Sequence, residues 1–287
     1  MAINSKDECN RKKMNLREGM LVFLMVVLAG VFICPVLLVL MNSFKNKLYI
    51  SDAPFEMITN ETFAGINNYV SGIEKTGLPA AACRSVFITV FSVIVIVLLT
   101  SMTAWWITRV NSRLSSILYY LFVFAMIVPF QMVMFTLSKI TDMLGMGNPI
   151  GIIYVYVGFG AGLSVFMFSG FVKAIPVSLE EAAMIDGCNP IQIFFSVVAP
   201  VLRPTMITVA ILNTMWIWND YLLPTLVLDS AEPTIPMAIQ YLRGGYGAID
   251  MGAMMAMLVL VIIPIIVFYL LCQKYIISGV AAGAVKG

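Results

Sequence analysis

The chain has 287 residues, of which 61% are hydrophobic and 11% charged, and it contains no histidine. Soluble globular proteins are usually about 45–50% apolar and about 25% charged, so this composition excludes an ordinary cytosolic enzyme. Seventeen Lys and Arg residues against 15 Asp and Glu residues give a net charge of +2, which does not indicate a nucleic-acid-binding protein. The lack of histidine, together with five cysteines without a CxxC pair, predicts no metal site. The composition is that of an integral membrane protein.

Six apolar stretches are each long enough to cross about 30 Å of hydrocarbon as a helix rising about 1.5 Å per residue. They cover residues 20–42, 86–108, 117–138, 150–172, 205–225 and 252–275. We therefore predict an all-α polytopic membrane protein with six transmembrane helices. Residues 1–19 form a cytoplasmic N-terminal segment, and residues 20–287 form a single transmembrane domain. The first stretch follows basic residues but shows no small-residue cleavage site, which predicts an uncleaved first helix.

The distribution of basic residues predicts the orientation of the chain in the membrane. With the N-terminus inside, eleven of the 17 Lys and Arg residues fall in inner segments and six in outer ones. Both termini are therefore expected in the cytoplasm. Two outer loops, residues 43–85 and 226–251, are long. The first has several Gly and Pro residues among polar ones, which predicts a folded extracytoplasmic cap rather than a helix.

Several catalytic motifs are missing from the sequence. There is no GxxxxGK[ST] phosphate loop, no GxSxG and no HExxH. The sequence therefore lacks the motifs typical of a P-loop ATPase, a serine hydrolase and a zinc protease. Gly158 and Gly162 lie four residues apart within an apolar stretch, which favours close helix–helix packing over a nucleotide-binding loop.

The segment between the fourth and fifth stretches, residues 173–204, carries the most local information. Ser178 followed by Glu181 has the spacing of a capping box, which predicts that a short helix starts at Ser178. Gly187 is placed to end that helix in a left-handed turn. Asn189 with Pro190 then predicts the start of a second helix.

Pro200 and Pro204 predict the end of this second helix, so two short helices should form a cytoplasmic elbow. A capped elbow of this kind is suited to transmit force between a soluble partner and the membrane helices. Ala182 and Ala183 leave a flat face, and Glu181 offers a charge to a basic residue on the partner. The alternative is that Glu181 only caps its own helix while the loop lies on the membrane surface.

A family resemblance rests on this segment. The segment contains Glu181-Ala182-Ala183, then Gly187 after three residues, Val197 after nine more, and Ala199-Pro200 after one more. This pattern resembles the EAA-x3-G-x9-I-x-LP loop of bacterial ABC-importer permeases, with Val in place of Ile and Ala in place of Leu. The longer string from Pro176 to Gly187 and Trp218-Asn219-Asp220 are similar to the carbohydrate-uptake branch. The C-terminal residues 273–287 are similar to the tails of MalG-type permeases, the shorter partners in maltose-transporter-like heterodimers.

The resemblance implies a non-catalytic permease of a bacterial inner or plasma membrane. It would pair with a second, MalF-like permease, receive a carbohydrate from an extracytoplasmic binding protein, and dock on a dimeric ATPase. ATP and Mg²⁺ would be used by that ATPase, with no cofactor on this chain. The residues implied in the ATPase contact are Glu180, Glu181, Ala182, Ala183, Asp186 and Gly187, with Gly283 and Lys286 of the tail nearby.

Two further sets of residues are weaker candidates. Arg243, Gly244 and Tyr246 in the second outer loop are candidates for contact with the binding protein, and the alternative is an ordinary exposed loop. The only acidic residue placed within an apolar stretch is Asp220, which, with Trp216 and Asn219, suggests a place on the substrate pathway. The alternative is an aromatic belt at the outer membrane interface.

Three other functions are alternatives to the importer. An ABC permease for another solute keeps the mechanism and changes only the cargo. An ion-coupled secondary transporter usually has more spans, and the sequence shows neither an internal repeat nor a broken-helix pair. An intramembrane enzyme needs polar groups that converge at one depth, whereas Gln131, Asn213 and Asp220 are scattered.

Overall fold

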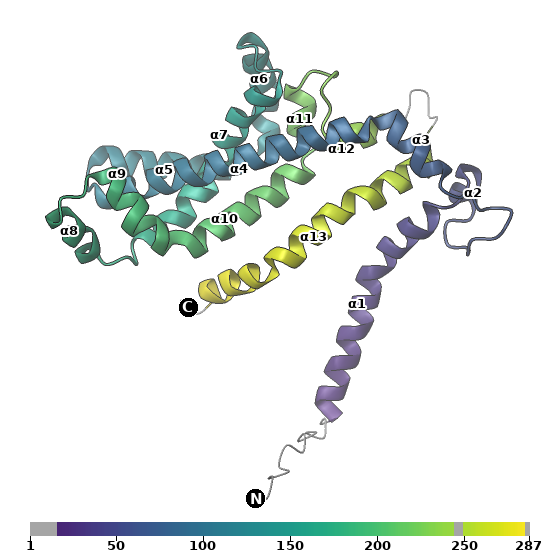
Figure 1. Cartoon of the computed structure of the whole chain (residues 1–287), viewed down its shortest axis with the longest axis horizontal. Helices are drawn as coiled ribbons and strands as arrows, with labels where there is room; N and C mark the ends of the chain where they lie inside the picture. Colours follow the sequence, from purple (N-terminus) through teal and green to yellow (C-terminus); the bar gives the residue numbers. More distant parts are fainter. Residues whose placement is uncertain (1–15, 244–248, 285–287) are drawn as a thin grey trace, which may run out of the picture.

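The computed structural model describes residues 16–243 and 249–284, with side chains for residues 17–243 and 249–275. Within those ranges every regular element is a helix, as the sequence predicts (Figure 1). The elements are α1 Leu16–Asn42, α2 Lys47–Asp52, α3 Asn67–Thr76, α4 Leu78–Arg109, α5 Arg113–Ile127, α6 Phe130–Met143, α7 Pro149–Val172, α8 Val177–Ile185, α9 Pro190–Ile193, the π-helical turn η1 Phe194–Val198, α10 Ala199–Asn219, α11 Leu222–Val227, α12 Ile235–Tyr241 and α13 Met251–Ala284.

Five helical segments among the described residues are long and apolar enough to cross a membrane. They are α1, α4, α7, the continuous run Pro190–Asn219, and α13. The predicted third span is instead a bent pair, α5 and α6, whose axes differ by 104°. The start of α5 lies beside the end of α7, where both line one cavity, and α6 leads into the start of α7. The pair therefore runs from one end of α7 to the other, as a sixth crossing would.

The bend between α5 and α6 has a local cause at Pro129. Proline has no N–H for the helical ladder, and it forces the residue before it out of the helical region. Val128 is accordingly extended (φ −69°, ψ 119°), and Pro129 caps the start of α6. The third predicted span, residues 117–138, is therefore divided between two helices. The sequence did not reveal this broken-helix pair.

The centre of the bundle is α7, which packs against α4, α5 and α10. Two glycines allow this close packing. A Cβ atom on Gly160 would lie 2.7 Å from the Ile96 side chain, and one on Gly162 would lie 2.9 Å from the Phe122 carbonyl oxygen. Gly158 has no atom within 4 Å of that position, so only the Gly162 part of the predicted face makes a close contact, with α5, while Gly160 meets α4 and α10 on another side of the helix.

The predicted cap, residues 43–85, is more helical than expected. It contains α2 and α3, and α4 already starts at Leu78. Asn68 at the start of α3 donates from its amide to the carbonyl oxygens of Ser43 and Lys45, both at 2.8 Å. The buried Lys45 donates to the Ala53 carbonyl oxygen at 3.0 Å. These bonds satisfy the irregular backbone, so the cap keeps helices despite its Gly and Pro content.

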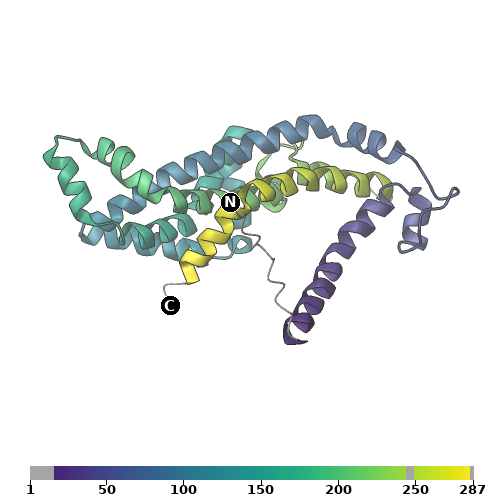
Figure 2. The same ribbon diagram turned by 60° about the horizontal axis from the view of Figure 1, so that its bottom comes forward.

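Helix α1 stands apart from the rest of the molecule. It leaves the other helices at an angle, and its later half meets α13 (Figures 1 and 2). Pro35, Val36 and Val39 line a cavity of about 520 Å³ shared with α13. None of the residues in the most apolar window of α1 is buried. This helix therefore presents nearly its whole apolar surface to lipid or to another protein.

Candidate functional site

The candidate site is α8 and the turn that follows it, which project at one end of the bundle (Figure 1). The helix starts at Val177, and Pro176 at the N-cap makes no side-chain hydrogen bond. Ser178 therefore lies inside the first turn instead of at the cap. The predicted capping box between Ser178 and Glu181 is not formed. The fixed φ angle of Pro176, and not a capping box, determines where the helix starts.

The end of α8 is as the sequence predicts. Gly187 adopts φ +84°, a left-handed conformation that costs little only for glycine. Its N–H donates to the Met184 carbonyl oxygen, and the Cys188 N–H donates to that of Ala183, both at 3.0 Å. These two bonds form a Schellman motif. No atom lies within 4 Å of a Cβ built on Gly187. Position 187 therefore favours glycine because of its backbone conformation and not because a side chain would lack space.

The second helix also begins as predicted. The side-chain oxygen of Asn189 accepts a hydrogen bond from the Gln192 N–H at 2.9 Å, and that of Gln192 accepts one from the Asn189 N–H at 2.8 Å. Pro190 occupies the first turn of the helix. The helix does not end at Pro200, however. It continues to Asn219 through the π-helical turn η1, where the Ala199 N–H reaches the Phe194 carbonyl oxygen. This wider turn accommodates the missing proline N–H. The elbow is therefore one short helix joined to a long one.

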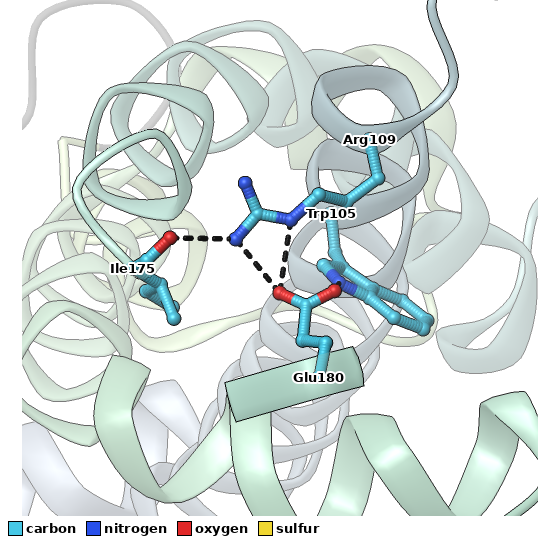
Figure 3. A network of polar contacts seen from close by, with 4 residues as sticks. All are labelled: Trp105, Arg109, Ile175 and Glu180. Atoms are coloured by element: carbon cyan, nitrogen blue, oxygen red, sulfur yellow. Dashed lines mark hydrogen bonds and ion pairs between the residues drawn. The ribbon is translucent and has the colours of Figure 1, made fainter. Parts of the chain in front are cut away.

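A buried ion pair fastens α8 to the end of α4 (Figure 3). Arg109 donates from Nη2 and Nε to Oε1 of Glu180, at 2.7 and 2.9 Å. The same Nη2 donates to the Ile175 carbonyl oxygen at 2.9 Å. Trp105 donates from Nε1 to Oε2 of Glu180 at 3.0 Å. Both carboxylate oxygens are therefore bonded. We call these four residues the α4–α8 clamp.

The clamp changes the interpretation of Glu180. This residue is only 3% exposed, so its carboxylate is not available to a separate protein. A buried carboxylate is costly unless it is paired and hydrogen-bonded, and the clamp supplies both. This burial argues against the predicted contact between Glu180 and an ATPase and indicates that Glu180 holds α8 in place. Arg109 and Trp105 were missed because they lie more than 70 residues earlier in the chain.

The other predicted residues of the elbow lie on its outer surface. Glu181, Ala182, Asp186 and Gly187 are exposed, and Ala183 is half-buried against the core. Ile185 is 86% exposed beside them, which is unusual for an isoleucine. The outer face of α8 therefore combines two carboxylates, a small flat residue and a bare apolar side chain. We call Glu181, Ala182, Ile185 and Asp186 the outer face of α8.

The predicted pathway residues lie at the opposite end of α10. Asp220 follows the last residue of α10, and Oδ1 accepts from the Leu222 N–H at 3.0 Å. Tyr156 of α7, which sequence reasoning missed, donates to Oδ2 at 3.1 Å and packs edge-on against Trp216 with centroids 5.4 Å apart. Asn219 instead lines the cavity between α1 and α13. Asp220 is thus at the end of a span and not within it, which corrects the prediction.

The remaining candidates are only partly described. Arg243 is exposed just after α12. Gly244, Tyr246 and Lys286 lie outside the described residues, and Gly283 falls in the last turn of α13.

Comparison with known proteins identifies the family. The family described as the inner membrane component of binding-protein-dependent transport systems matches residues 96–281, a stretch that holds the clamp, α8 and α10. The chain belongs to this family. It is therefore a transport permease subunit.

Relatives of the permease align over nearly its whole length. A probable starch degradation products transport system permease of Thermoanaerobacterium thermosulfurigenes is 38% identical over 280 residues, covering 96% of this chain and 99% of that protein. A multiple sugar-binding transport system permease of Streptococcus mutans is 33% identical, covering 92% and 96%. A chain of a bacterial ABC transporter involved in alginate import has the same fold, with TM-score 0.72, 21% identity, and coverage of 96% and 99%.

Proposed function

We propose that this permease is the membrane subunit of a binding-protein-dependent ABC importer for carbohydrates. Support comes from the relatives named above, whose names refer to starch degradation products and to multiple sugars. The exposed Trp216 and the carboxylate of Asp220, which is held by the buried Tyr156, add chemical support, because an aromatic face and a carboxylate are groups that bind sugar rings and hydroxyls. This group lies at the end of α10 remote from α8, where a substrate would enter from outside.

The outer face of α8 is the proposed contact with a cytoplasmic ATPase. The observation that carries this proposal is the split between Glu180 and Glu181. One carboxylate is buried to hold the helix, and the next is left exposed on it. An exposed carboxylate beside a bare Ile185 suits a groove that has an apolar floor and a basic residue on its wall.

The α4–α8 clamp makes this contact mechanically useful. Because α8 is bonded to Arg109 and Trp105, a displacement of α8 also displaces the end of α4. Helix α4 in turn packs along α7 and α10, which leads to the proposed sugar group. A movement imposed by ATP binding in a separate subunit would thus be passed through packed helices to the substrate end. The permease itself takes no chemical step.

A second permease is the proposed occupant of the surface left bare by α1 and α13. No residue in the most apolar window of α1 is buried in the described chain, and Ile263, Ile266 and Val267 of α13 are about half exposed. We place both termini and α8 in the cytoplasm of a bacterium, from the excess of basic residues in the inner loops. Arg243 then lies outside, where a sugar-binding protein would dock.

The test is affinity capture of the tagged permease from its native membranes in mild detergent. Wild type, Glu181→Lys and Glu74→Lys are compared, with partners identified by mass spectrometry. Glu74 is an exposed carboxylate on α3, at the other end of the molecule, so its charge reversal is the matched control. We expect an ATPase and a second permease with wild type and with Glu74→Lys, and loss of the ATPase alone with Glu181→Lys.

Two results would contradict the proposal. Recovery of folded wild-type protein without any ATPase would contradict the proposal that the permease works in an ATP-driven importer. An ATPase retained equally by both variants would remove the outer face of α8 as the contact. The cargo is tested separately, by uptake of labelled maltodextrin, melibiose and an amino acid into cells with and without the gene. Uptake of the amino acid alone would favour a permease for another solute.

A further inference from the structure

A polar cavity of about 460 Å³ lies at the α8 end of the permease. It is enclosed by the last residues of α4 and α7 and the first turns of α5. Its polar lining includes Thr108, Ser115, Ser116, Tyr119, Ser169 and Lys173. Three other cavities in the described chain are lined almost wholly by apolar side chains, as expected between membrane helices. The proposed function uses none of these residues.

Two hydroxyl groups in this cavity have no hydrogen-bond partner within the described residues. They are Oγ1 of Thr108 and Oγ of Ser169, and Ser169 is only 2% exposed. Buried hydroxyls are nearly always bonded, because leaving one unpaired is unfavourable. Ser115 and Ser116 differ, since their hydroxyls already donate to the carbonyl oxygens of Val110 and Ser112. Two donors therefore remain for a molecule that enters the cavity.

The charge in the cavity favours an anion. Lys173 lines it and lies with its ammonium group 5.8 Å from the centre of the Tyr119 ring. None of the described residues that line the cavity is acidic. The first turn of α5, which carries Ser115 and Ser116, adds the positive end of a helix dipole. One ammonium and two unpaired hydroxyls are a donor set that suits a phosphate group.

The surface next to the cavity indicates that this phosphate belongs to a lipid. One face of α5 continues away from the cavity as a bare apolar strip. Ile117, Leu121 and Phe124 on it are 61%, 57% and 67% exposed. A membrane protein presents such a strip to acyl chains, and tyrosines such as Tyr120, which is 69% exposed, mark the headgroup level. Headgroup donors thus lie directly beside a surface for the lipid tails.

We propose that this cavity binds the phosphate headgroup of an anionic phospholipid, with the acyl chains along α5. Thr108, Ser169 and Lys173 donate to the phosphate oxygens. The site lies between the ends of α4 and α7, beside the clamp, so a bound lipid holds together the helices from which α8 projects. Only the assignment to the cytoplasmic leaflet rests on the proposed function. The binding itself does not.

The test is a lipid titration of the purified full-length chain, followed by native mass spectrometry. Its arms are phosphatidylglycerol, phosphatidylcholine and inorganic phosphate without lipid. Lys173→Gln removes the charge, and Ser169→Ala removes one unpaired hydroxyl without disturbing any hydrogen bond in the described chain. Lys139→Gln is the matched control, because Lys139 is an exposed lysine on α6, away from the cavity. The folding of each variant is checked by its thermal unfolding.

We expect one tightly held phosphatidylglycerol, little phosphatidylcholine, and affinity weakened about fivefold by Lys173→Gln. Ser169→Ala should weaken binding in the same direction, and Lys139→Gln should not change it. If Lys139→Gln weakened the binding of phosphatidylglycerol as much as Lys173→Gln, the effect would come from the net charge of the protein, and the proposed site would be overturned. Equal binding of both lipids would also overturn it, and tight binding of inorganic phosphate alone would assign it to a free anion. No ATPase or transport is needed, so failure here is distinguishable from failure of the importer proposal.

Discussion

The two ends of the permease each fasten a short helix with an ion pair, and the two pairs differ in burial. At the α8 end, Glu180 is 3% exposed and the Arg109 side chain 18%. At the cap end, Lys75 of α3 pairs with Asp250 before α13, with side chains 55% and 22% exposed. The first pair is enclosed by Trp105 and the Ile175 carbonyl group. The second is open to water on the lysine side.

This difference shows what each pair is suited to do. A buried, fully bonded pair fixes one geometry, because any other arrangement leaves a charge without a partner. An exposed pair is weakened by water and salt and contributes little to stability. The end proposed to transmit force thus has the rigid attachment. The cap instead relies on neutral bonds such as those of Asn68, with the ion pair as a minor addition.

The largest expected effect is that of Glu180→Ala. It leaves the largely buried Arg109 guanidinium without its carboxylate, which should cost about 3 kcal/mol of stability. Thermal unfolding of the purified variant in detergent measures this, with Lys75→Ala as the counterpart from the other end. The contrast between the two ends is lost if the two substitutions lower the unfolding temperature equally.

A smaller effect is expected for the turn that ends α8. Gly187→Ala places a Cβ atom on a left-handed residue and should cost roughly 1 kcal/mol. Gly170→Ala is the matched control, since Gly170 also has open space around its Cβ position but lies within α7 in an ordinary helical conformation. Unfolding temperatures should fall for Gly187→Ala and rise slightly for Gly170→Ala. Equal changes would mean that the turn is not strained.

The smallest effect is expected at the exposed pair. Lys75→Ala should change stability by at most about 1 kcal/mol, and less at high salt. The pKa of Asp250 is lowered overall: burial acts to raise it, but the hydrogen bond and charge of Lys75 and the Ala253 N–H outweigh this. Because the folded pKa is the lower one, the stabilisation exists above the unfolded pKa and disappears as pH falls through the folded pKa.

This pH dependence can be isolated with Asp250→Asn, which cannot titrate. Unfolding temperatures of wild type and variant, measured from neutral to acidic pH, should differ slightly at neutral pH and converge in acid. A difference that persists or grows in acid would contradict the assignment of the pair.

The parts of the fold that sequence reasoning predicted are those with local causes. Gly187 and Asn189 mark turns whose hydrogen bonds join neighbours in the chain, so their residue types were sufficient. The break at Pro129 also has a local signal, a proline inside an apolar run, and was missed because hydrophobic length dominated the interpretation. Pro200 led to the opposite error: it predicted the end of a helix, but the helix continues through a π-helical turn.

The clamp could not be predicted from local pattern. Glu180 and Glu181 are adjacent and chemically identical, and only the packing of α8 against α4 decides which is buried. Tyr156 was hidden for the same reason, because its bond to Asp220 joins residues 64 apart. Residues whose role depends on a distant partner need the three-dimensional structure, even where the motif that contains them is obvious.

The most direct test of the account is the amount of sugar imported per ATP hydrolysed by Arg109→Lys in the complete complex, reconstituted in vesicles. Lysine keeps the charge but cannot bond Glu180 and the Ile175 carbonyl group in the same fork, so the clamp loosens while the outer face of α8 stays intact. We expect that the ATPase still binds and hydrolyses ATP while import per ATP falls. An unchanged ratio of import to hydrolysis would contradict the role of the clamp.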